Sequence, residues 1–148
     1  MSEILATVKL FESNVIDNKE QEVNWADKKV DYVGLYFSAH WCPPCKKFTP
    51  VLAEFYERHS ESKKFEIVFV TCDESESSFK KYYKDMPWLA VKFDEKILEK
   101  LKLDYSVDGV PMLIFIDAKT GETVNADGRH WVTTDPKAEK FPWKDAKE

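Results

Sequence analysis

Two cysteines, Cys42 and Cys45, stand three positions apart between two contrasting segments of the chain. Residues 31–38 (DYVGLYFS) form a nearly continuous apolar run of strand length, which is typical of a strand covered on both faces. Residues 46–60 carry apolar side chains at helical spacing. The pattern predicts a buried strand, then the cysteine pair, then an amphipathic helix. This order constrains the fold strongly, because it places a C-x-x-C pair at the start of a helix.

The start of a helix favours a reactive sulfur at Cys42. Its unpaired N–H groups and partial positive charge stabilise a thiolate, which is the form that attacks disulfides. We expect Cys45 one turn further along, within reach of Cys42 and less exposed, as suits a resolving thiol. Pro43 and Pro44 fit the first helical positions, where a missing N–H costs little. They also remove two backbone donors near Cys42, so we expect a reductant rather than a strong oxidant.

The rest of the chain alternates between strand and helix patterns. Such alternation implies β-α-β crossovers and an α/β fold whose central sheet carries helices on both faces. A turn at 119–122 leads into a short strand at 123–125, and this final hairpin makes the sheet mixed. The other predicted elements are strands at 65–71 and 111–117 and helices at 73–84 and 95–103.

The two ends of the chain carry weaker patterns. Within 1–25, alternating apolar residues predict an edge strand that extends the sheet; they are Ile4, Ala6, Val8 and Leu10. The stretch 133–148 is polar and lysine-rich apart from Phe-Pro-Trp at 141–143, and we expect these aromatic residues to pin the tail onto the domain. No segment resembles a linker, so the chain is expected to form a single domain over 1–148.

Composition excludes several classes of protein. Lys and Arg number 22 against 27 Asp and Glu, a net charge of −5 that lacks the electrostatic footprint of a nucleic-acid binder. No run approaches the ~18 apolar residues of a membrane span. The first ten residues do not form a secretory signal. Only three cysteines, two of them neighbours, indicate a reducing compartment, so we expect the cytoplasm, with the nucleus left open.

Two other uses of the cysteine pair stay open on the residues alone. A C-x-x-C pair is also half of a structural zinc site, which takes four ligands. The other candidate ligands are Cys72 and three histidines, and none is paired at ligand spacing. Buried cysteines also serve as inert core residues. The strand–motif–helix context favours redox chemistry over both, and we expect no metal and no bound cofactor.

Two further prolines belong to the same region of the fold. Pro50 lies inside the predicted helix, where it forfeits the hydrogen bond to the Lys46 carbonyl and should kink the axis. Pro111 stands at the mouth of a predicted strand. Most X-Pro bonds are trans, so the residues alone predict a trans bond at Pro111.

These motifs together resemble the thioredoxin superfamily, and more narrowly its tryparedoxin and nucleoredoxin branch. The superfamily match rests on WCPPC at 41–45, on Pro50 and on Gly-Val-Pro at 109–111. The similarity runs from about residue 30 to the C-terminus. The narrower match rests on FSAHWCPPCKKFTPVLAEFY (37–56), CDE (72–74), MPWLAVKF (86–93), VDGVPMLIFID (107–117) and FPWKDA (141–146).

The resemblance implies a thioredoxin fold with a redox-active disulfide between Cys42 and Cys45. Cys42 takes the place of the exposed nucleophile and Cys45 that of the resolving thiol. The resemblance also implies a cis bond at Pro111, facing the pair, which reverses the expectation from the residues alone. In the family, the backbone of the residue that matches Val110 pairs with the bound substrate chain.

The resemblance also marks a substrate side. Trp41 matches a residue of the surface beside the nucleophile. Glu74 and Arg129 match positions that line the substrate side in tryparedoxins. For Arg129 the resemblance is the only reason to select it, because a solvated surface arginine is equally compatible with the pattern.

The chain departs from the superfamily pattern at three positions. Tyr36 stands where ordinary thioredoxins have a buried aspartate, so the proton acceptor for Cys45 must come from elsewhere; Glu74 and a water held by Tyr36 are the candidates. His40 stands where a serine or glutamate is frequent; it is either solvated or an imidazolium that stabilises the Cys42 thiolate. Cys72 replaces an aromatic residue of tryparedoxins and is either a packing residue or a regulatory third thiol.

The function expected from these features is that of a thiol–disulfide oxidoreductase that reduces protein disulfides. No dinucleotide fingerprint is present, so an external reductase or low-molecular-weight thiol must restore the dithiol. Peroxiredoxin-type peroxidases are plausible clients, and a monomer is the default state. The alternative is a redox-gated interaction module of nucleoredoxin type that holds a partner without turnover.

Overall fold

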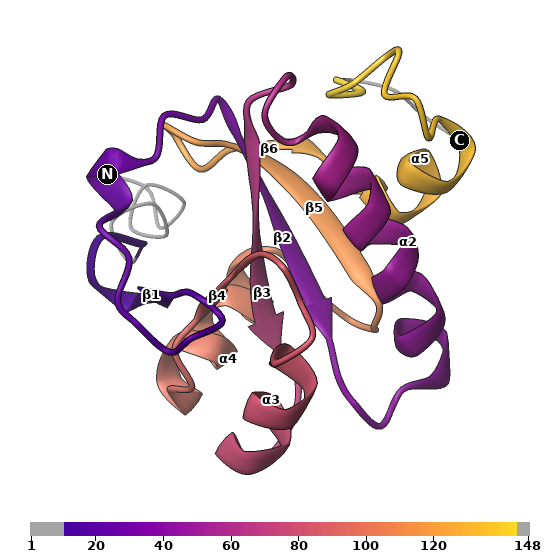
Figure 1. Cartoon of the computed structure of the whole chain (residues 1–148). Coiled ribbons are helices and arrows are strands. Elements are labelled where there is room, and N and C mark those ends of the chain that lie inside the picture. Colours follow the sequence, from indigo (N-terminus) through magenta and orange to yellow (C-terminus); the bar gives the residue numbers. More distant parts are fainter. Residues whose placement is uncertain (1–10, 145–148) are drawn as a thin grey trace.

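The apolar runs form the centre of a six-stranded mixed sheet in the computed structural model, which describes residues 11–144 (Figure 1). The strand order is β1-β4-β3-β2-β5-β6. β2 runs parallel to β3, β3 runs parallel to β4, and the pairs β2–β5, β5–β6 and β1–β4 are antiparallel. The strands are β1 (Val15–Ile16), β2 (Tyr32–Ser38), β3 (Phe65–Thr71), β4 (Leu89–Val91), β5 (Met112–Asp117) and β6 (Thr123–Asn125).

Helices cover both faces of the sheet, as predicted. One face packs against side chains of α2, α3 and α5 in a single aromatic-rich core. The other face packs against α4 and against residues of the N-terminal segment. Figure 1 shows α2 and α5 side by side over the first face. The helices are the short η1 (Trp25–Asp27), α2 (Pro43–His59), α3 (Glu76–Tyr83), α4 (Glu95–Asp104) and α5 (Gly128–Thr134).

Most predicted elements are present, with adjusted ends. The expected helix at 73–84 begins at Glu76, because the Ser75 hydroxyl caps it by accepting from the backbone N–H of Ser78. α2 continues through Pro50, as its apolar spacing indicated. An N-terminal edge strand exists as β1, whereas the alternating residues that predicted it (Ile4, Ala6, Val8 and Leu10) lie outside the described residues. Three elements, η1, β4 and α5, were not predicted.

The C-terminal aromatic residues pin the tail, as expected. Trp143 is almost fully buried and packs into the core that α2 and α5 share. Its indole N–H donates to Asp135 Oδ2 at 2.9 Å, and its carbonyl accepts from the Asn125 amide at 2.9 Å. The Phe141–Pro142 peptide bond is cis. Among residues 11–144, no helix is long and apolar enough to cross a membrane.

Gly128 allows α5 to approach β5. A Cβ atom built at Gly128 would lie 2.8 Å from the carbonyl oxygen of Leu113 and 2.7 Å from its Cγ. Only a residue without a side chain fits this contact unless the backbone moves. The close approach matters for the site, because α5 also carries Arg129.

Replacing Gly128 by alanine should therefore destabilise the protein. We expect Gly128→Ala to lower the free energy of unfolding by about 1–3 kcal/mol through overpacking, measured by urea denaturation. Gly109→Ala is the matched control, since a Cβ there meets no atom within 4 Å. It should change stability by less than about 0.5 kcal/mol. Equal effects of the two substitutions would contradict the close contact.

Candidate active site

Cys42 is the N-cap residue of α2. Its backbone is extended (φ −104°, ψ 108°), and its sulfur accepts a hydrogen bond from the backbone N–H of Cys45 at 3.3 Å. Pro43 and Pro44 occupy the first helical positions, as predicted. The two cysteines lie side by side, with Cys42 4% exposed and Cys45 fully buried. Both are free thiols in this structure.

A cis-proline loop faces the cysteine pair. The Val110–Pro111 peptide bond is cis, so the resemblance predicted it correctly and the residues alone did not. The Cys42 thiol donates to the Val110 carbonyl oxygen at 3.8 Å. Trp41, the neighbouring residue, is 57% exposed and is one of the few large apolar side chains that faces solvent. The described residues thus place a sulfur, a backbone carbonyl and an exposed indole at one end of the sheet.

Cys45 differs from Cys42 in its surroundings. Burial, followed by a hydrogen bond with Cys42, raises the pKa of the Cys45 thiol to about 11, although the Ser38 hydroxyl and the Ala39 backbone act in the opposite direction. At pH 7 the Cys45 thiol is therefore protonated. Any reaction in which Cys45 acts as a nucleophile must therefore remove a proton from a buried thiol.

Tyr36 occupies the position of the missing aspartate with a hydroxyl group. Its side chain is fully buried, and burial raises its pKa above the usual range for tyrosine. The hydroxyl lies 2.6 Å from Thr49 Oγ1 and donates to the Cys45 carbonyl at 3.4 Å. Tyr36 thus stays neutral and contacts the helix backbone of Cys45. Glu74, the other candidate proton acceptor, has an exposed side chain in the loop before α3.

His40 is anchored to a buried carboxylate that the sequence analysis did not select. Its ring Nδ1 lies 2.5 Å from Asp73 Oδ1, and its backbone N–H donates to the same oxygen at 3.1 Å. The other oxygen, Asp73 Oδ2, accepts from the Thr71 hydroxyl at 3.3 Å. The ring is therefore half-exposed and fixed rather than freely solvated. Asp73 shapes the loop that leads to Cys42.

Arg129 and Glu74 have different places relative to the cis-proline. Arg129 is exposed on α5 and lines a hollow of about 520 Å³ together with Pro111. Glu74 is not one of the residues that line this hollow. The structure thus brings Arg129 to the cis-proline side.

Cys72 packs beside the pair rather than standing apart. It is partly buried against the cluster formed by Ala39, Cys42 and Cys45. Burial raises the pKa of its thiol, with Lys102 acting in the opposite direction. Within residues 11–144, no group of three or more His, Cys, Asp or Glu side chains gathers in a way that could hold a metal ion.

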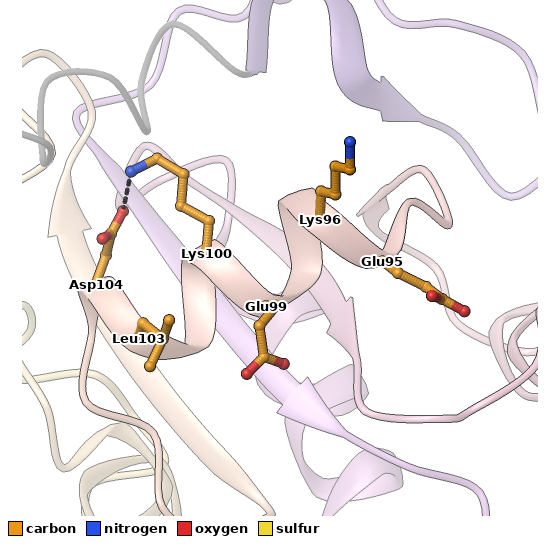
Figure 2. A pocket seen from close by; sticks show the side chains of 6 residues that line it. All are labelled: Glu95, Lys96, Glu99, Lys100, Leu103 and Asp104. Atoms are coloured by element: carbon orange, nitrogen blue, oxygen red, sulfur yellow. Dashed lines mark ion pairs between the residues drawn. The ribbon is translucent and has the colours of Figure 1, made fainter.

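A separate hollow of about 650 Å³ lies on α4 (Figure 2). All of its lining residues belong to this one helix, and the Lys100 ammonium pairs there with Asp104 at 3.1 Å. None of the cysteines lines it. We therefore place the candidate active site at the cysteine pair and not at this hollow.

The fold and the adjacent cysteines define a thiol–disulfide oxidoreductase with the thioredoxin fold. The chain belongs to the thioredoxin-like family, whose family model matches residues 29–123. Tryparedoxin of Trypanosoma brucei brucei is 46% identical over 127 residues, which cover 85% of this chain and 88% of that protein. Nucleoredoxin of Xenopus laevis is 46% identical over 131 residues, 87% of this chain. The chain spans 31% of the length of that nucleoredoxin.

A solved structure of a relative agrees with the whole fold. Tryparedoxin II in complex with glutathionylspermidine superposes with a TM-score of 0.88 at 38% identity. The match covers 93% of this chain and 99% of that chain. The resemblance to the tryparedoxin and nucleoredoxin branch, which the motifs predicted, is confirmed. The predicted thioredoxin fold is confirmed as well.

The raised pKa of Cys45 predicts an alkaline weakness of the reduced protein. A thiol whose pKa is higher in the folded than in the unfolded chain contributes stability below its ordinary pKa, near 9, and this contribution is lost as pH rises through about 11. Two pH units correspond to about 2.7 kcal/mol at full ionisation. Between pH 8 and pH 11, urea unfolding should show the reduced protein losing about 2 kcal/mol more than Cys45→Ala.

The oxidised protein is the internal control for this measurement. It has no ionisable thiol at position 42 or 45, so, like Cys45→Ala, it should be spared the loss of stability that the Cys45 thiol contributes. If the reduced protein also matched both, the pKa of Cys45 would not be raised.

Proposed function

We propose that Cys42 is the nucleophile and Cys45 the resolving thiol of a disulfide reductase that acts on other proteins. The observation that carries this assignment is the position of the Cys42 sulfur. It caps the start of α2 and lies 3.8 Å from the carbonyl oxygen that precedes cis-Pro111. Cys45 lies one turn further in and is fully buried, so a large substrate reaches Cys42 first.

The reaction follows from this order of access. The Cys42 thiolate attacks one sulfur of the substrate disulfide, the substrate S–S bond breaks, and the released thiolate takes a proton from solvent. Cys45 then loses its proton and attacks the Cys42 sulfur. A Cys42–Cys45 disulfide forms and the second substrate sulfur leaves as a thiolate. The substrate gains two electrons, and an external thiol returns two electrons to the protein by the same exchange.

The neighbouring groups support binding of an extended substrate chain. The backbone of Val110 can pair with such a chain by strand-like hydrogen bonds, and Pro111 holds the loop next to the sulfur. The exposed ring of Trp41 offers apolar surface beside the same point. Arg129 supplies a positive charge across the hollow that it shares with Pro111. We assign these residues, with Glu74 at the outer edge, to substrate binding.

The relatives suggest the clients and the reductant. One relative is a tryparedoxin whose structure is a complex with glutathionylspermidine, a low-molecular-weight thiol. A thiol of that class, or a separate reductase, would reduce the Cys42–Cys45 disulfide in this chain. Peroxidases of the peroxiredoxin type, which need a thiol donor, are the proposed clients. On the strength of its cysteine usage we place the protein in the cytoplasm, with the nucleus left open, and we take a monomer as the default state.

Replacing the resolving thiol should trap the clients. In Cys45→Ser the second exchange is blocked, so mixed disulfides should accumulate at Cys42 and appear on non-reducing gels, with the linkage located by mass spectrometry. The same variant should reduce insulin in the presence of dithiothreitol only at the background rate of dithiothreitol. Cys42→Ser should lose both trapping and turnover.

Cys72→Ser is the matched control, because it removes the third thiol and leaves the pair intact. It should retain insulin reduction within about twofold. Linkage through Cys72 in the trap variant would overturn the assigned roles. Binding of partners with no turnover by the native protein would favour the interaction module, which the match to tryparedoxin does not support.

Arg129 and Glu74 should contribute unequally to substrate binding. Arg129 shares the hollow with Pro111, so Arg129→Gln should raise KM for an oxidised peroxiredoxin about fivefold, equivalent to about 1 kcal/mol. Glu74→Gln should change KM by less than about twofold. Steady-state kinetics with the client as the varied substrate measures both. A larger effect at Glu74 would move the binding surface away from α5.

A further inference from the structure

A connected series of hydroxyl groups from β2, α3 and α2 lies beside the first turn of α2, which carries Cys45. The Ser38 hydroxyl lowers the pKa of the buried Cys45 thiol, and Thr49, at the other end of the series, donates to the Cys45 carbonyl at 2.9 Å. Ser38 is the last residue of β2 and is fully buried. Its Oγ lies 2.8 Å from the phenolic oxygen of Tyr82 on α3. The Tyr82 oxygen lies 2.9 Å from Thr49 Oγ1 on α2.

Hydroxyl groups suit the transfer of a proton along such a series. Each is at once a donor and an acceptor, and its proton can rotate to serve either neighbour. Ser38–Tyr82 and Tyr82–Thr49 are hydrogen bonds in which either oxygen can donate. Thr49 Oγ1 also contacts Tyr36, whose hydroxyl stays neutral, and donates to the Cys45 carbonyl. No new charge has to be buried as the proton passes.

The series ends at solvent. Thr49 and Tyr82 both line a groove of about 610 Å³ between α2 and α3. Ser38 does not line this groove and is sealed from water. The groove also carries five charged side chains that keep it hydrated; they are Lys46, Glu54, Glu57, Lys81 and Asp85.

The two carboxylates in the loop after β3 are either engaged by other groups or exposed to solvent. Asp73 is held by His40 and by the Thr71 hydroxyl. Glu74 is exposed in the loop before α3. The hydroxyl series therefore provides the connected route from the Cys45 side chain to water that the described residues define.

We propose that Ser38 and Tyr82 form a proton relay that deprotonates Cys45 during resolution of the mixed disulfide. The inference rests on the proposed function and names how its second step proceeds. As Cys45 attacks the Cys42 sulfur, its proton passes to Ser38 Oγ, the Ser38 proton passes to Tyr82 Oη, and the Tyr82 proton passes to water in the groove. The departing substrate thiolate takes a proton from solvent, so protons and electrons balance.

The relay predicts a defect confined to the second exchange. Reduced protein mixed with dithiobis(nitrobenzoate) releases one thionitrobenzoate when Cys42 attacks and a second when Cys45 resolves the mixed disulfide. Stopped-flow absorbance separates the two phases. Because general acid–base assistance contributes roughly 10²–10⁴-fold, Tyr82→Phe should slow the second phase by at least about tenfold and leave the first unchanged. Ser38→Ala should do the same.

Tyr83→Phe is the matched control. It removes a buried tyrosine hydroxyl from the adjacent position of α3, where the hydroxyl contacts the carbonyls of Ile16 and Trp88 and not the relay. The test variant Tyr82→Phe removes only the hydroxyl, so its ring keeps the edge-on packing that Tyr82 makes against Phe69. Tyr83→Phe is therefore expected to alter stability without altering the ratio of the two phases.

The pH profile separates a relay from a structural role. The defect of Tyr82→Phe should shrink as pH approaches about 11, where hydroxide removes the Cys45 proton directly. A defect of constant size at all pH values, or a second phase as fast in Tyr82→Phe as in Tyr83→Phe, would overturn the relay and leave the proposed function intact. Absence of the first phase in the native protein would overturn the proposed function itself.

Discussion

The junction between β2 and α2 is the constraint on which the active site depends. β2 lies inside the sheet, paired with β3 on one side and β5 on the other, so the position of its last residue is determined by two rows of backbone hydrogen bonds. The chain then reaches the helix cap at Cys42 within four residues. The sulfur consequently sits where the helix N–H groups converge and where the loop before Pro111 meets it.

Short-range sequence patterns predicted the strands and helices that hydrophobic burial and periodicity determine. The apolar run at 31–38 and the helical spacing after Cys45 reflect burial and periodicity, so both elements were found from the residues. β4 and α5 were missed for a physical reason. β4 has three residues, and α5 is a short helix that begins at a glycine and is held by close packing against Leu113. Neither carries a periodic signal long enough to detect.

The same distinction applies to the site. The roles proposed for Cys42 and Cys45 follow from spacing, whereas the hydrogen bonds of Ser38 and His40 join segments that are far apart in the chain. Ser38 and Tyr82 are 44 positions apart in the chain, and His40 and Asp73 are 33 apart. Such contacts depend on strand register and helix placement. Asp73 lies two residues after β3, and the sequence alone does not mark it as buried.

Alternation along β2 has a consequence for how the length of this chain can vary. Tyr36 and Ser38 face α2 and α3, while Leu35 and Phe37 face the opposite core. A one-residue insertion or deletion within the strand would exchange these sets and place phenylalanine beneath the thiol. A change of length that keeps the site intact must therefore fall outside the stretch from β2 to Cys42.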